Sequence, residues 1–227
     1  EGDGGIDVLV VNRDGPAHLF RNIVSGRGSW ARIRVLDGHG RDALGARLTL
    51  TVGDRVVTRV VRSAYSYCAS NDAAVHVGLG AASGIDAVEV HWLDGSNETF
   101  NYDERGNLLS ASNQQGTIHF EYDNADRMTR VNYPNGRFLE YTYNELGQRT
   151  RLTDGADYTV HYLYDAAGRL TELRDANQQG VAAYSYDSEN RLTRVERGNN
   201  TATAYSYDSA SQLTRLANIS HDGSLHS

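Results

Sequence analysis

The stretch that decides the fold is Tyr162-Leu163-Tyr164-Asp165-Ala166-Ala167-Gly168-Arg169-Leu170-Thr171. Its core, two aromatic residues at i and i+2 followed by Asp or Asn, occurs six times, with the Asp or Asn at positions 103, 123, 144, 165, 187 and 208. Intervals of 20 to 22 residues between these positions indicate one supersecondary unit repeated along an array.

Each copy predicts a β-hairpin. The two aromatic side chains share one face of a strand. The Asp or Asn then opens a four-residue turn, and its fourth residue takes a left-handed conformation that Gly, Asn and Asp tolerate. Ser211 fits this closing position worst. We expect structural turns at Asp103, Gly106, Asp123, Asn144, Gly147, Asp165, Gly168, Asp187 and Asp208.

The aromatic pairs of successive hairpins should form a ladder on one face of an antiparallel sheet. The return strands supply the matching row Leu108, Met128, Leu170, Leu192 and Leu213. Arg149 interrupts this row, which predicts a less buried or bent unit there. The ladder predicts a ligand or assembly surface at Tyr143, Tyr164, Tyr186 and Tyr207. Tyrosine faces can stack on sugars, but the alternative is a ladder that serves only the packing of the sheet.

These residues resemble the YD repeats of the RHS family, which includes bacterial polymorphic toxins, insecticidal toxin-complex proteins and the teneurins. The resemblance covers about 100–217. It implies a β-sheet that spirals into a hollow shell, often around a toxic cargo. In some members the repeats are implicated in carbohydrate binding or cell adhesion.

Residues 29–99 alternate between apolar and polar residues as half-buried strands do. Strands are predicted at 30–36, 46–52, 55–62, 75–79 and 87–92, with a two-residue hairpin turn at Gly53-Asp54. At least five short strands over about seventy residues predict a small sandwich or barrel.

This region resembles the ASPIC/UnbV domain, which follows FG-GAP propellers in bacterial surface proteins. The matching residues are Gly45-Ala46-Arg47, Tyr67, Ser70-Asn71-Asp72, Val75-His76-Val77-Gly78-Leu79-Gly80, Val88-Glu89-Val90-His91-Trp92 and Asp94-Gly95. The resemblance covers about 25–99 and implies architecture and a surface location rather than catalysis.

Residues 1–24 include a short apolar strand at 8–11. Asp3-Gly4 and Asp7 look like the second half of an FG-GAP calcium loop, in which carboxylate oxygens surround a hard cation. This resemblance implies the last blade of a propeller and a calcium site at Asp3 and Asp7; the alternative is a surface turn.

Composition excludes several classes of function. All 22 basic residues are Arg, the net charge is −7, and neither half has a basic patch, which argues against nucleic-acid binding. No apolar run is long enough for a membrane span. Because the chain begins with Glu, we expect a processed product or a fragment of a longer protein.

Catalytic and metal-binding patterns are weak. We expect the single cysteine, Cys68, to be a small buried thiol. His76 and His91 fall on strands expected to be adjacent, where a metal pair would need Glu89 or Asp72 as a third ligand; the favoured alternative is histidines that are hydrogen-bonded or exposed on their strands. Three nearby serines offer the residue types of a triad with His76 and Asp72 but no nucleophile elbow: Ser63, Ser66 and Ser70.

The sequence therefore predicts an all-β protein that is not an enzyme. Its predicted parts are a propeller remnant at 1–24, a small β-sandwich at 25–99, six YD repeats at 100–217 and a tail at 218–227. We expect a structural segment of a large secreted or cell-surface protein, whose partners are other parts of a longer chain. The alternatives are a filament or adhesin subunit joined to its own copies through open sheet edges, and a carbohydrate-binding module.

Overall fold

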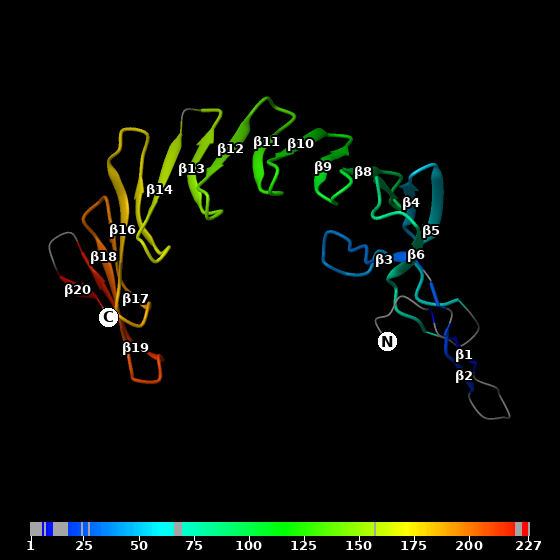
Figure 1. The fold of residues 1–227 in the computed structure, drawn as a ribbon, viewed down its shortest axis with the longest axis horizontal. Coiled ribbons are helices and arrows are strands. Elements are labelled where there is room, and N and C mark those ends of the chain that lie inside the picture. The colour runs from blue at the N-terminus through cyan, green and yellow to red at the C-terminus, as the bar shows by residue number, and fades with distance from the viewer. Residues whose placement is uncertain are drawn as a thin grey trace. The chain divides into compact units, whose positions relative to one another are not determined.

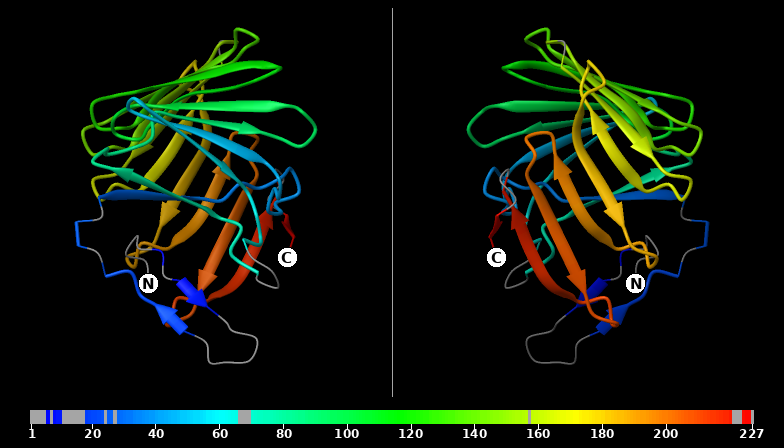
Figure 2. Two further views of the ribbon diagram at one scale, coloured as in Figure 1. Left: turned by 90° about the vertical axis from the view of Figure 1, so that its right-hand side faces the viewer. Right: turned by 90° about the vertical axis from the view of Figure 1, so that its left-hand side faces the viewer.

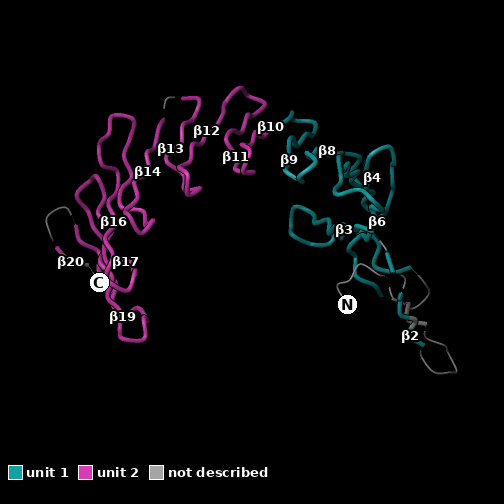
Figure 3. The backbone as a smooth tube through the Cα atoms, viewed as in Figure 1, with its two compact units in different colours: residues 1–119 teal, residues 120–227 magenta. Residues whose placement is uncertain are grey.

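The computed structural model describes residues 6, 8–10, 18–23, 25–26, 28–65, 70–156, 158–220 and 224–226. These residues contain strands, turns and bends but no helix, so the all-β prediction is confirmed (Figure 1). The chain divides into two compact units, residues 1–119 and residues 120–227 (Figure 3). The domain boundary expected from the sequence, between residues 99 and 100, stays a prediction.

Unit 1 begins with an isolated hairpin of β1 (Val8–Val10) and β2 (His18–Phe20). Its other strands form two sheets. The smaller sheet pairs β3 (Ser29–Ile33) with β6 (Val75–Gly80). The larger sheet has the order β5-β4-β7-β8-β9-β10. Its strands are β4 (Arg47–Val52), β5 (Arg55–Val60), β7 (Ala87–His91), β8 (Asn97–Tyr102), β9 (Leu108–Asn113) and β10 (Gly116–Tyr122), the last of which contains the unit boundary.

Alternating apolar residues of the two sheets build one core in unit 1. Leu48 and Leu50 on β4 are fully buried, as are Val75 and Val77 on β6. Val88 and Val90 on β7 complete the cluster between the sheets. This is the small sandwich expected from the period-two pattern.

Unit 2 is an antiparallel meander in which sequential strands pair in the order β10 to β20. Figure 2 shows its strands side by side with the connections along the two edges. The strands are β11 (Met128–Asn132), β12 (Phe138–Tyr143), β13 (Arg149–Asp154), β14 (Thr159–Tyr164), β15 (Leu170–Arg174), β16 (Gly180–Tyr186), β17 (Leu192–Arg197), β18 (Ala202–Tyr207), β19 (Leu213–Ile219) and β20 (Leu225–His226).

The register of these strands gives unit 2 two different faces. Tyr162 lies opposite Leu173 and Tyr164 opposite Leu170, so the aromatic pair and the aliphatic row share one face, here called the ladder face. Leu163 lies opposite Glu172 on the other face. That second face carries weak surface ion pairs between Arg130 and Glu140, Arg174 and Glu172, and Arg194 and Glu196.

Side chains of the ladder face are mostly half-buried. Among the described residues of unit 2, only Val131, Val160, Ala202, Thr203 and Ala217 are buried. The described strands of unit 2 all belong to one sheet, so within unit 2 the neighbouring repeats supply most of the burial of each ladder residue.

The sequence predicted a less buried or bent unit at Arg149, and both expectations were wrong. Arg149 is half-buried like Leu170 and Leu192, and the exposed member of the row is Leu213, at 52%. The register shift between Thr142 and Tyr143, opposite Arg149, recurs at the same place in four other repeats, so it is a feature of the repeat rather than a local bend.

Candidate functional site

The Asp of each repeat builds its turn with its own side chain. Asp165 Oδ1 accepts the backbone N–H groups of Ala167 at 3.0 Å and Arg169 at 2.9 Å. The backbone N–H of Gly168 donates to the Asp165 carbonyl at 2.9 Å, and the Asp165 N–H donates to the Arg169 carbonyl at 3.0 Å. Four backbone N–H groups of a tight turn are therefore hydrogen-bonded within five residues. Asp103, Asp123, Asn144, Asp187 and Asp208 repeat this backbone geometry.

The fourth residue of every such turn has a positive φ. The angles are 88° at Gly106, 59° at Asp126, 78° at Gly147, 80° at Gly168, 62° at Asn190 and 62° at Ser211. Non-glycine residues other than Asn and Asp are strained in this region. Ser211 therefore has the least suitable side chain for its backbone conformation.

We expect Ser211→Asn to stabilise the chain by about 0.5 kcal/mol, because Asn tolerates the left-handed conformation better. The substitution keeps a side-chain acceptor. Ser211 Oγ accepts a hydrogen bond from Arg191 Nη1 at 3.2 Å. In the preceding repeat, Asn190 Oδ1 accepts the equivalent bond from Arg169 Nη1 at 2.8 Å. Urea unfolding measures the change. Ser209→Asn, in the same turn but without a positive φ, is the control and should give no gain.

The residue after the turn connects one repeat to the next. Arg169 Nε donates to Asp165 Oδ2 at 2.7 Å, and Arg169 Nη1 reaches Asn190 Oδ1 of the following turn at 2.8 Å. Arg127 and Arg191 reach the following turn in the same way, through the carbonyls of Asn144 and Asp208. Gln148 donates to the Gly168 carbonyl at 2.7 Å, so an amide can replace the guanidinium. No sequence prediction above included these links.

Hydrogen bonds lower the pKa of these turn carboxyls. The backbone N–H and then the side chain of Arg169 lower the pKa of Asp165, and the Arg127 side chain does the same for Asp123. In unit 1 the Arg41 backbone N–H is the largest cause that holds the pKa of Asp37 at about 2.

These shifts predict acid-sensitive stability. A carboxyl whose folded pKa lies below its unfolded value of about 3.9 contributes fully above that pH and loses its contribution as the pH falls through the folded pKa. We therefore expect the midpoint temperature of thermal unfolding to decrease as the pH is lowered from about 4 to about 2. Asp165→Asn should reduce this dependence, since Asn144 already supports such a turn; an unchanged pH profile in this variant would contradict the assignment to the turn carboxyls.

The second tyrosine of each of the last four pairs is tied to the preceding repeat. Tyr164 donates its hydroxyl to the Arg149 carbonyl at 2.8 Å, and Tyr186 donates to the Leu170 carbonyl at 2.8 Å. Tyr143 and Tyr207 do the same to Met128 and Leu192, at 2.6 and 2.8 Å. Burial raises the pKa of the Tyr164 and Tyr186 hydroxyls.

Arginines cover three of these rings. The guanidinium carbons of Arg127, Arg169 and Arg191 lie 4.9, 4.9 and 5.0 Å from the ring centres of Tyr143, Tyr186 and Tyr207. These distances permit cation–π attraction. One arginine thus holds its own turn, the next turn and the next tyrosine together.

The first tyrosine of each pair is placed differently. Tyr184 and Tyr205 lie on the same face but donate no hydroxyl hydrogen bond within the described residues. Tyr141 and Tyr162 lie beside Arg149, whose guanidinium carbon is 4.6 and 5.8 Å from their ring centres. The Nε of Arg149 is buried and has no hydrogen-bond partner.

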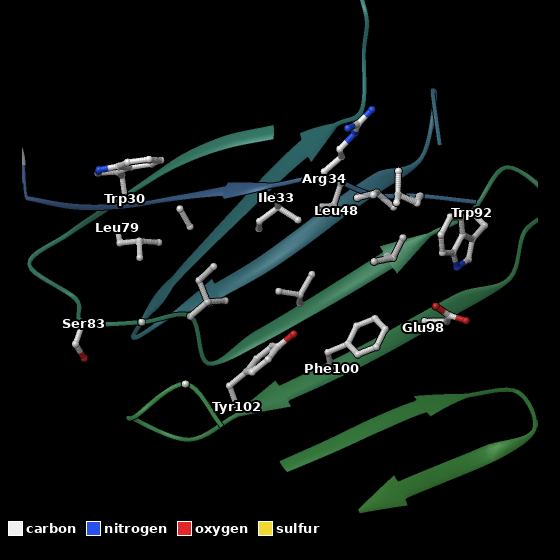
Figure 4. A pocket seen from close by; sticks show the side chains of 18 residues that line it. Trp30, Ile33, Arg34, Leu48, Leu79, Ser83, Trp92, Glu98, Phe100 and Tyr102 are labelled. Atoms are coloured by element: carbon white, nitrogen blue, oxygen red, sulfur yellow. The ribbon is translucent and has the colours of Figure 1, made fainter. Parts of the chain in front are cut away.

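Unit 1 holds a separate cavity, of about 580 Å³, between the small sheet and the inner face of the large sheet (Figure 4). Its aromatic lining residues are Trp30, Trp92, Phe100 and Tyr102. Its charged lining residues are Arg34 and Glu98. No motif in the sequence predicted this cavity.

The structure does not bring His76 and His91 together as a metal pair. The strands that carry them, β6 and β7, belong to different sheets and are not neighbours. His76 stacks on Trp30 with ring centres 5.3 Å apart, and His91 lies 3.4 Å from Glu89. The described residues contain no group of three metal-ligand side chains.

Other predicted site residues cannot be placed or are otherwise engaged. Asp3, Asp7, Ser66 and Cys68 lie outside the described residues. Asp72, the acid of the serine triad considered above, pairs with Arg32. Calcium binding at Asp3 and Asp7 stays a prediction.

Comparison with known families agrees with the two resemblances. A family model described as ASPIC and UnbV matches residues 37–118. Models described as RHS Repeat and Teneurin YD-shell match residues 102–138 and 131–222. Residues 37–118 thus match the ASPIC/UnbV model, and the residues that follow match models of YD repeats. The ASPIC/UnbV match lies within unit 1 and the YD-shell match within unit 2.

Solved toxin structures share the fold. A TcdB2-TccC3-Cdc42 crystal structure matches 84% of this chain at 16% identity and a TM-score of 0.54. A TcdB2-TccC3-TEV structure matches 96% of it at 15% identity and a TM-score of 0.54. The Tc holotoxin pore of Photorhabdus luminescens matches 83% at 16% identity and a TM-score of 0.51. The chain covers only 11% of each of these three toxin chains.

No curated protein matches the chain. In the described residues, no helix is long and apolar enough to cross a membrane.

Proposed function

We propose that the chain is a non-enzymatic structural segment of a larger secreted or cell-surface YD-repeat protein, in which unit 2 forms part of a shell wall. The observation that carries this proposal is the chain of ties between repeats. Each central repeat uses its Arg or Gln, and its second tyrosine, to hold the backbone of a neighbouring repeat. A wall needs such continuity and needs no reactive group.

Two further observations support this reading. The hydroxyls of Tyr143, Tyr164, Tyr186 and Tyr207 are already used within the sheet, which favours a structural role for the tyrosines named as a candidate ligand surface. Solved structures with this fold include the Tc holotoxin pore of Photorhabdus luminescens, which favours a secreted toxin-type context.

Cryo-electron microscopy of the whole protein, expressed from its complete gene, tests the proposal. A wall segment predicts that the sheet of unit 2 continues through further repeats into an enclosing shell. An isolated sheet in solvent, with no enclosed volume, would overturn it.

Self-assembly through sheet edges is the second candidate function. Edge strand β5 exposes Val56, at 66%. Near the other end, Leu213 and Leu216 on β19 are exposed, whereas their counterparts Leu192 and Val195 are half-buried. Unpaired edges with apolar residues are templates for strand addition from another copy.

Negative-stain electron microscopy of the purified 227-residue chain, with and without calcium, distinguishes the two candidates. Filaments with a fixed axial repeat would support assembly through edges. Discrete single particles in both conditions would remove that candidate and favour a piece of a wall.

A further inference from the structure

The cavity in unit 1 has the size and lining of a small-molecule site. Its volume of about 580 Å³ lies within the roughly 300–1,000 Å³ of typical ligand pockets. Most of its lining is aliphatic or aromatic, with few polar groups. Nothing in the repeat architecture of unit 2 accounts for it.

The register of β7 and β8 determines which side chains form one wall. Val90 lies opposite Glu98, and Val88 lies opposite Phe100. Because alternate residues share a face, Trp92 and Glu98 are diagonal neighbours on the side of the sheet that lines the cavity. Figure 4 shows Trp92 and Glu98 at one end, with Phe100 and Tyr102 following along β8.

The charges at the cavity are not balanced. Arg34 is neutralised by Asp42, to which it donates two hydrogen bonds of 2.7 and 3.1 Å. Glu98 has no ion pair or hydrogen bond from a side chain in the described part of the chain. The one uncompensated charge of the described lining is therefore negative, and it stands beside the ring of Trp92.

We propose that this pocket binds a small organic cation, an ammonium group attached to an aromatic body. The ammonium pairs with the Glu98 carboxylate, and the electron-rich face of Trp92 attracts the same charge. The aromatic body fills the apolar part of the cavity beside Phe100 and Tyr102. An anionic ligand is disfavoured because it would meet Glu98 while Arg34 is already engaged. This site is independent of the wall proposed for unit 2.

Tryptophan fluorescence is a specific readout, because the two tryptophans of the chain, Trp30 and Trp92, both line the cavity. The probe is phenethylamine, protonated at neutral pH, titrated at constant ionic strength into the whole chain. Its neutral analogue, phenethyl alcohol, has the same aromatic body without the charge. We expect saturable binding of the amine with at least about a tenfold lower Kd than the alcohol, as one charge-assisted contact predicts.

Two isosteric variants test the role of the carboxylate. Glu98→Gln should raise the Kd of phenethylamine about tenfold and leave that of the alcohol unchanged. Glu89→Gln removes a carboxylate from the opposite face of the same sheet and should change neither. Equal Kd values for amine and alcohol in the unmodified chain, absence of saturable binding, or an equal effect of the two variants would each overturn the proposal. The comparison of the Kd values of amine and alcohol in the unmodified chain tests the proposal even if Glu98→Gln does not fold.

Discussion

Replacing Leu50 by alanine is expected to lower the free energy of unfolding of unit 1 by about 4 kcal/mol. Leu50 is in the middle of β4, is 0% exposed, and is hydrogen-bonded through its strand to both β5 and β7. Its side chain contributes to the one core that joins the two sheets. The neighbouring strands are fixed on both sides, so the cavity left by truncation cannot collapse.

Urea unfolding followed by tryptophan emission measures this loss, because both tryptophans lie in unit 1. Val56→Ala is the control: Val56 is on adjacent β5 but is exposed, so we expect a change within about 0.5 kcal/mol. Similar losses for the two variants would show that the sandwich does not have the core described above.

Replacing Tyr186 by alanine is expected to cost about 3 kcal/mol in unit 2. The substitution removes a half-buried ring, its contact with the Arg169 guanidinium and its hydrogen bond to the Leu170 carbonyl. Arg169 also holds two turns, so its loss of a packing partner affects more than one repeat.

Urea unfolding followed by far-ultraviolet circular dichroism and tyrosine emission reports on this variant. Tyr158→Ala is the matched control, because Tyr158 lies in a connection at the edge of the sheet and is 57% exposed. A loss for Tyr186→Ala no larger than that of the control would mean that the ladder face contributes little to the sheet.

Much of the repeat could be predicted because its determinants are local. The aromatic pair, the Asp and the closing residue lie within seven positions of one another, and the turn they form uses hydrogen bonds over at most four residues. Even the poor fit of Ser211 follows from its own backbone preference.

The ties between repeats were missed although they leave a periodic signal. The fourth residue after each turn Asp or Asn is always Arg, Gln or Asn: Asn107, Arg127, Gln148, Arg169, Arg191 and Gln212. Long donors at this place are explained by the next turn, which lies within their reach. Arg149 was misjudged because a guanidinium can pack between tyrosine rings as an aliphatic side chain does.

Features of unit 1 that depend on distant pairing could not be predicted. The strands of His76 and His91 were assumed adjacent because they are consecutive in sequence, but β6 pairs with β3, more than forty positions earlier. The same non-local pairing places Trp30 and Trp92 around one cavity. Sequence periodicity gives the face of a strand but not the sheet that it joins.

The most direct test of a structural ladder compares Tyr186→Phe with Tyr184→Phe by urea unfolding. The two variants remove one hydroxyl each from the same strand and the same face. Tyr186 donates to the Leu170 carbonyl at 2.8 Å, whereas Tyr184 donates to no group in the described residues. We predict a loss of about 1 kcal/mol for Tyr186→Phe and a change of no more than a few tenths for Tyr184→Phe. Equal changes, or a larger loss at Tyr184, would contradict the conclusion that the second tyrosine of each of the last four pairs ties the repeats together.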